Sequence, residues 1–167
     1  MIVCLLERKN HLANHSTRAP TEDWIRYRDS ELHKELNEFK QFVIHWMEKY
    51  DSREKLLLVT YEDLIDYEKG PVAATRIADF LGETDGVDPI ANESIPCVWH
   101  AVVKYKDSVA NPMSLRKGQV ERPYTENQLA EMKAILEDLM VKFSNDVELV
   151  SILASYMDTV TNTVPTD

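Results

Sequence analysis

Two basic segments of the chain carry side chains suited to binding a phosphate group. Arg8 is followed eight residues later by Ser16, and a tripeptide Arg116-Lys117-Gly118 lies far downstream. A guanidinium forks onto two phosphate oxygens, and a nearby hydroxyl donates a further hydrogen bond. Glycine lets the backbone approach a ligand closely, while the adjacent Arg and Lys supply a fork and a point charge. Each pattern also occurs on ordinary solvated surfaces, so neither predicts a phosphate site alone.

Other side chains capable of chemistry are better explained by structural roles. Glu62 and Asp63 follow an apolar run, a position where catalytic carboxylates occur, but turn and helix-start chemistry accounts for them. His100, beside Trp99, is a candidate to face a substrate, although a surface histidine is the commoner case. No zinc, calcium or haem signature is present, so no metal is predicted.

Composition bounds the class of protein. A chain of 167 residues predicts one domain, over 1–157, followed by a disordered tail at 158–167. A net charge of -10 disfavours nucleic acid and anionic lipid as partners. No apolar run is long enough to span a bilayer, and the start is too short for a signal peptide, so a cytoplasmic location is predicted. Cys4 and Cys97 are interpreted as reduced, buried thiols.

Local patterns predict two strands and two helices in the first half of the chain. The continuous apolar runs Ile2–Leu6 and Lys55–Tyr61 predict strands buried on both faces, as in a parallel sheet. A helix from the N-cap Ser30 to Tyr50 is predicted by one apolar stripe: Leu32, Leu36, Phe39, Val43, Trp46, Met47 and Tyr50. Gly70-Pro71 opens a second helix. This helix is predicted to end at Gly82 in a left-handed conformation. The residues predicted on its inner face are Val72, Ala73, Ile77, Phe80 and Leu81.

The second half of the chain begins with a long segment of loop-like composition. It covers Glu83–Pro112, and Trp99 with Val102–Val103 is expected to anchor it to the core. The capping-box spacing of Thr125 and Gln128 then predicts a helix to about residue 143. A last amphipathic helix is predicted at Val147–Met157. Strands alternating with helices predict an α/β layered domain that is rich in helix and has few parallel strands.

Taken in order, these features resemble the PAPS-dependent sulfotransferases, where PAPS is 3′-phosphoadenosine 5′-phosphosulfate. The Tyr61–Leu64 segment (YEDL) and the helix end Ile77–Gly82 are similar to the middle element of that family. The family also binds the 3′-phosphate of the nucleotide with an Arg and a Ser eight residues apart and with an Arg-Lys-Gly loop. The residues that resemble this set are Arg8, Ser16, Arg116, Lys117 and Gly118.

The resemblance implies a fold, a cofactor and an activity. The fold would be a truncated P-loop-NTPase-like sulfotransferase α/β layer structure. The cofactor would be PAPS, or its product adenosine 3′,5′-bisphosphate, and the reaction would transfer a sulfonate to a hydroxyl of a carbohydrate or small molecule. A Golgi-lumen location is the alternative if the chain is part of a longer membrane-anchored enzyme.

The chain departs from the family where the 5′-phosphosulfate is held. It has no Gly-rich turn with a Lys after a strand, and the family's catalytic base, which follows that loop, is also missing. Two interpretations remain open: the C-terminal portion of a longer enzyme, or a shortened, non-catalytic binding or interaction module completed by a partner chain. A third interpretation is an unrelated helical scaffold in which the short motifs occur by chance.

Overall fold

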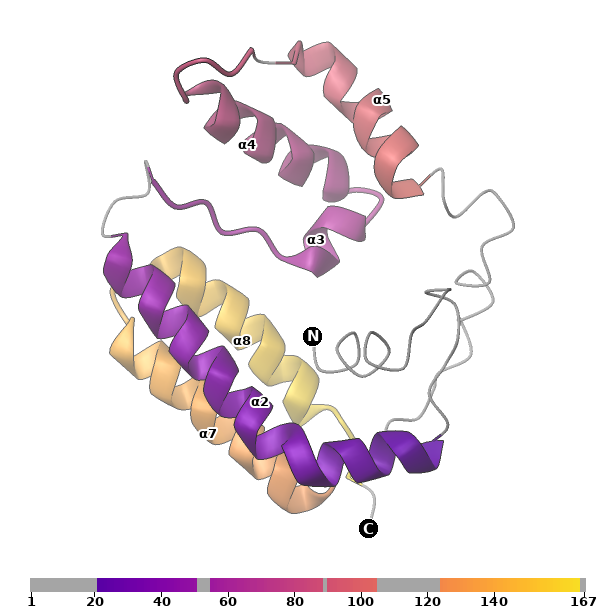
Figure 1. Cartoon of the computed structure of the whole chain (residues 1–167), viewed down its shortest axis with the longest axis vertical. Helices are drawn as coiled ribbons and strands as arrows, with labels where there is room; N and C mark the ends of the chain where they lie inside the picture. Colours follow the sequence, from indigo (N-terminus) through magenta and orange to yellow (C-terminus); the bar gives the residue numbers. More distant parts are fainter. Residues whose placement is uncertain (1–20, 51–54, 89, 105–123, 166–167) are drawn as a thin grey trace. The chain divides into compact units, whose positions relative to one another are not determined.

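The structure is a computed structural model that describes residues 21–50, 55–88, 90–104 and 124–165. The chain divides into two compact units. Unit 1 combines Met1–Lys49 with Gln119–Asp167, and unit 2 is Tyr50–Gly118. The helices of each unit are drawn in Figure 1. The single domain predicted over 1–157 stays a prediction.

Helix α2, Thr21–Lys49, is the longest element of unit 1 and begins well before the predicted start. Ser30 is not its N-cap but lies inside it, where the hydroxyl donates to the carbonyl oxygen of Tyr27 at 3.2 Å. The early turns were missed because charged side chains share the buried face, which breaks the apolar repeat. The buried residues of α2 are Trp24, Arg28, Leu32, Glu35 and Leu36. Trp46, predicted on the buried stripe, is 36% exposed.

Helices α7, Glu126–Lys142, and α8, Val147–Thr161, follow each other and pack together. The predicted capping box at the start of α7 is confirmed. The amide of Gln128 donates to the Thr125 hydroxyl oxygen at 3.3 Å, and the amide of Thr125 donates to the Gln128 side chain at 3.0 Å. Helix α8 continues to Thr161, so the first residues of the predicted disordered tail are helical.

Helix α7 also packs along α2, and the two helices run in the same direction. The direction follows from polar pairs whose members advance together along both helices. These pairs are Asp29 with Gln128, His33 with Glu131, Lys40 with Asp138, and Glu48 with Lys142. The core of unit 1 lies between the three helices, and its most buried side chains, Leu139 and Leu153, are 0% and 1% exposed.

Unit 2 is built from short helices. They are α3 (Tyr61–Ile65), α4 (Gly70–Gly82), η1 (Asn92–Ser94), α5 (Ile95–Trp99) and the π-helical η2 (His100–Lys104). Much of the segment predicted as loop is therefore helical. Its Pro96 does not break a helix, because it takes one of the first two positions of α5, which suit proline. Trp99 anchors this segment as predicted and is 5% exposed, whereas Val102 is 63% exposed.

The α/β fold predicted from the sequence is wrong: the described ranges contain helices and neither a strand nor a sheet. In the predicted strand at Lys55–Tyr61, Lys55 is an exposed bend, the half-buried residues 56–60 belong to neither helix nor strand, and Tyr61 already begins α3. An apolar run becomes a strand only when a neighbour supplies ladder hydrogen bonds, and no described segment does so. The other predicted strand, Ile2–Leu6, lies outside the described residues.

Helix α4 confirms the predicted start at Gly70 and end at Gly82. The predicted left-handed stop at Gly82 is wrong, because the helix closes on Glu83 in right-handed geometry and the positive φ, 82°, falls at Gly86. The predicted inner face is also too wide, since Val72 is 61% exposed and Leu81 48% exposed.

Candidate functional site

The five residues predicted to bind the 3′-phosphate lie outside the described residues: Arg8, Ser16, Arg116, Lys117 and Gly118. The described chain resumes after each of these two segments. Helix α2 begins at Thr21, five positions after Ser16. Tyr124 stands just before α7, six positions after Gly118.

These two points of the chain, far apart in sequence, lie close together in unit 1. The Trp24 ring, 3% exposed, meets the Tyr124 ring edge-on at a centroid distance of 5.5 Å and an interplanar angle of 79°. Such aromatic pairs contribute about 0.5–1.5 kcal/mol beyond the area they bury. The contact fixes the start of α7 against the first turn of α2.

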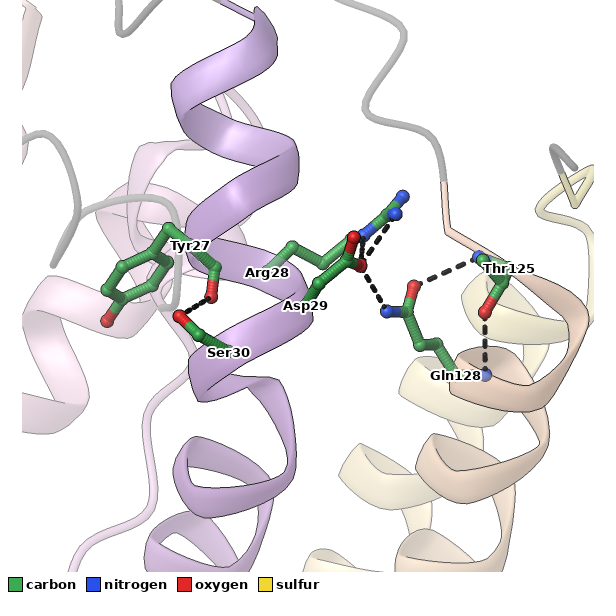
Figure 2. A network of polar contacts seen from close by, with 6 residues as sticks. All are labelled: Tyr27, Arg28, Asp29, Ser30, Thr125 and Gln128. Atoms are coloured by element: carbon green, nitrogen blue, oxygen red, sulfur yellow. Dashed lines mark hydrogen bonds and ion pairs between the residues drawn. The ribbon is translucent and has the colours of Figure 1, made fainter.

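A polar network next to this contact ties the same two helix ends together (Figure 2). Arg28 donates from Nε and Nη2 to Asp29 Oδ1, each at 2.7 Å. The same oxygen accepts from Gln128 Nε2 at 3.0 Å. Gln128 thus has two roles, since its side-chain oxygen also completes the Thr125 capping box. The Arg28 guanidinium, and then the Gln128 amide, hold the pKa of Asp29 below its usual range.

Two charged side chains of α2 are buried in this region. Arg28 is 6% exposed and Glu35 is 7% exposed. The Tyr27 hydroxyl donates to Glu35 Oε1 at 2.8 Å. Burial, followed by this hydrogen bond to an acidic partner, raises the pKa of Tyr27 to about 12. The phenol therefore stays protonated at neutral pH and acts as a hydrogen-bond donor rather than as a base.

The carboxylate of Asp63 in unit 2 has the structural role that the sequence analysis favoured over a catalytic one. Thr60 caps α3, with its hydroxyl oxygen accepting from the Asp63 amide at 3.1 Å. Lys69, at the start of α4, donates from Nζ to Asp63 Oδ1 at 2.9 Å. The bond from Lys69, helped by Thr60, lowers the pKa of Asp63. The carboxylate links α3 to the beginning of α4.

Replacing Lys69 with methionine is expected to raise the pKa of Asp63 toward its ordinary value, because the largest cause of the depression is removed. A depressed folded-state pKa stabilises the fold above the unfolded pKa of Asp, about 3.9, and that stabilisation is lost as pH falls through the folded value. Carboxyl NMR shifts followed between pH 2 and 6 measure the change. The same titration in Lys34→Met, whose lysine pairs with glutamates on α2, should leave Asp63 unaltered. An Asp63 titration identical to wild type in Lys69→Met contradicts the assignment.

Trp99 closes unit 2 around the turn between α3 and α4. Its indole Nε1 donates to the carbonyl oxygen of Leu64 at 2.7 Å. Its ring meets Tyr67 edge-on at 6.2 Å and lies against the buried Gly70. The ring lies directly against the backbone of Gly70, which leaves no room for a larger residue at that position.

Two further sequence candidates are placed by the structure at the surface. His100 is exposed on η2. The prediction of a buried thiol at Cys97 is wrong, because this cysteine is exposed. In the described ranges, no three His, Cys, Asp or Glu side chains gather as a metal site requires.

Sequence reasoning missed the Arg28–Asp29–Gln128 network. The signal was partly present, since Trp24, Arg28 and Leu32 follow one another at helical four-residue steps. Allowing one charged residue within that stripe would have extended α2 toward Thr21. The bridge to Gln128 leaves no such trace, because its partners are 99 positions apart.

No protein-family model matches the chain, and searches for similar curated proteins and similar solved structures found no match. Among the helices of the described ranges, none combines the length and the apolar character that crossing a bilayer requires.

Proposed function

We propose that the chain binds the 3′-phosphate of PAPS or adenosine 3′,5′-bisphosphate, in the manner of a PAPS-dependent sulfotransferase. The residues assigned to the phosphate are Arg8, Ser16, Arg116, Lys117 and Gly118. The observation that supports this proposal is the order and spacing of these residues in the sequence.

Within the described residues, the element between the two candidate segments lacks the strand that the resemblance calls for, but its two helices are present. An apolar run ends at Thr60, whose side chain caps the one-turn helix α3 of the YEDL segment. Helix α4 then ends at Gly82.

Sulfonate transfer to a hydroxyl of a carbohydrate or small molecule is the reaction that this cofactor serves. It requires charge neutralisation at the leaving phosphate, which a Gly-rich loop with a Lys supplies in the family. A partner chain or a preceding segment would have to provide that loop. The cytoplasm fits the chain as it stands, and the Golgi lumen fits a longer membrane-anchored enzyme.

A second candidate function is a non-catalytic module that binds the nucleotide or another protein. It is favoured by one feature of the sequence: none of the four glycines, Gly70, Gly82, Gly86 and Gly118, belongs to a Gly-x-x-Gly-Thr turn after a strand. Sulfonate transfer from PAPS to a panel of hydroxyl acceptors separates the two candidates. Transfer by the purified chain alone would exclude the non-catalytic module.

Thermal unfolding with and without adenosine 3′,5′-bisphosphate tests the shared binding step. At a ligand concentration 100 times Kd, binding stabilises a protein by about 2.7 kcal/mol, which raises Tm by several degrees in a chain of this size. Adenosine 5′-monophosphate, which lacks the 3′-phosphate, should give a much smaller shift.

Variants connect the shift to the assigned residues. The double variant Arg116→Ala/Lys117→Ala should lose the shift. The matched control is Arg26→Ala, because Arg26 is an exposed arginine on α2 whose side chain is 77% accessible. No shift for the wild-type chain at millimolar ligand would overturn the proposed function.

A further inference from the structure

The segment 56–60 of unit 2 carries backbone groups that no described segment pairs with. Figure 1 shows the chain running without a helical turn until α3 begins at Tyr61. Within the described ranges, the amides of residues 56–60 and the carbonyl oxygens of residues 56–59 make no backbone–backbone hydrogen bond. At Thr60 the pairing begins, since its carbonyl oxygen accepts from the Leu64 amide at 3.1 Å.

The burial of this segment makes its unpaired backbone significant. The side chains of residues 56–60 are all half-buried, so the backbone between them lies partly away from water. Backbone groups removed from water are nearly always hydrogen-bonded in folded proteins. A half-buried segment with open donors and acceptors is therefore a template for a further strand.

The residue types of the segment also suit strand pairing. Its sequence is three leucines, a valine and a threonine, with no proline, glycine or charged residue among them. Proteins protect a strand edge from other chains with prolines or inward-pointing charges. Residues 56–60 contain neither, so an incoming strand meets no such obstacle within the segment.

The charges at the two ends of the segment select the incoming strand. Lys55 precedes the segment and Glu62 follows it closely, and both are exposed. A second copy of the segment in antiparallel orientation sets Lys55 of each chain near Glu62 of the other, whereas a parallel copy sets like charges together. Opposite charges across a strand pair stabilise it, and like charges destabilise it.

Two copies of a chain with a net charge of -10 repel each other at long range. At physiological salt such repulsion is screened beyond about 8 Å, so the charges at the contact itself decide whether two segments fit. Antiparallel pairing of identical segments has a two-fold axis, which is the symmetry of most homodimers.

We propose that the segment 56–60 forms an antiparallel strand pair with the same segment of a second copy of this chain. Each copy contributes the same apolar residues and the same open backbone groups. Lys55 of one copy and Glu62 of the other flank the pair at both ends. The proposal does not rest on nucleotide binding.

Sedimentation of the full chain over a concentration series detects the dimer, and amide hydrogen exchange locates its interface. We expect a dimer, with exchange at residues 56–60 slowing as the dimer population rises and exchange in α7 unchanged. A monomer at every concentration overturns the proposal. Slow exchange at residues 56–60 that does not depend on concentration also overturns it, because the pairing partner would then lie in the same chain.

Charge variants test the orientation of the pair. Lys55→Glu and Glu62→Lys each set like charges together at both ends, and each should raise the dissociation constant of the dimer about tenfold. The double variant Lys55→Glu/Glu62→Lys restores opposite charges and should return the constant to within about threefold of wild type.

Glu83→Lys is the matched control, because it makes the same change of charge at the exposed C-cap of α4. It should leave the dissociation constant of the dimer within about threefold of wild type. Equal weakening by Glu62→Lys and Glu83→Lys, or no recovery in the double variant, would assign the dimer to another surface and overturn the proposal.

Discussion

Replacing Gly70 with alanine is expected to destabilise unit 2 by at least about 1 kcal/mol. An added Cβ would lie 2.6 Å from the carbonyl oxygen of Leu64 and closer still to the ring of Trp99. Neither neighbour can retreat independently, because the indole nitrogen donates to that same carbonyl oxygen at 2.7 Å.

Two effects compete at this position. Alanine gains about 1 kcal/mol over glycine inside a helix, whereas overpacking costs about 1–3 kcal/mol and more where the contacts are rigid. The clash prevails because its partners are backbone and a hydrogen-bonded ring. Relief would require both α3 and α5 to move away from the start of α4, and that would open the contact that buries Trp99.

Amide hydrogen exchange across α4 and α5 measures this loss, with the helices of unit 1 as an internal reference. Gly86→Asn is the control, because nothing lies within 4 Å of a Cβ at Gly86 and asparagine tolerates its φ of 82°. Slower exchange in α4 of Gly70→Ala than in wild type would show that helix propensity outweighs the clash.

Leu139→Ala is expected to lower the free energy of unfolding of unit 1 by about 2–5 kcal/mol. Leu139 is 0% exposed and lies on α7, the helix that packs against both α2 and α8. Truncation removes the transfer free energy of the side chain and leaves a cavity that three helices would have to close together.

Urea denaturation measures the change, which should appear as a lower midpoint with an unaltered slope. Val141→Ala on the same helix is the control, because Val141 is 76% exposed and its truncation should change stability by no more than about 0.5 kcal/mol. Equal losses in the two variants would place Leu139 outside the core.

The parts of the fold that the sequence predicted correctly depend on neighbours in the chain. The Thr125–Gln128 capping box and the Gly70-Pro71 helix start are signals of this kind, and the structure confirms both. The start of α2 was wrong because Arg28 and Glu35 occupy its buried face. The apolar run before Thr60 was assigned to a sheet because four apolar residues in a row do not reveal whether a neighbouring strand exists.

The candidate site, too, could be predicted from the sequence only in part. Residue types and their order predicted a phosphate-binding set, which lies outside the described residues and stays a prediction. The structure added two contacts that the sequence did not indicate, Trp24 with Tyr124 and Asp29 with Gln128. Contacts between partners so distant in sequence leave no periodic pattern, so no local signal could have found them.

The parallel pairing of α2 with α7 has a consequence for synthesis. Their partners are separated by 98 residues at His33 and Glu131 and again at Lys40 and Asp138. Ribosomes add about 5–20 residues per second, so on the order of 5–20 s pass between the emergence of α2 and that of α7. During that interval Trp24, Leu32 and Leu36 lack the helix that covers them. The nascent chain is then most exposed to aggregation and to capture by chaperones, and a translational pause before α7 would lengthen this period.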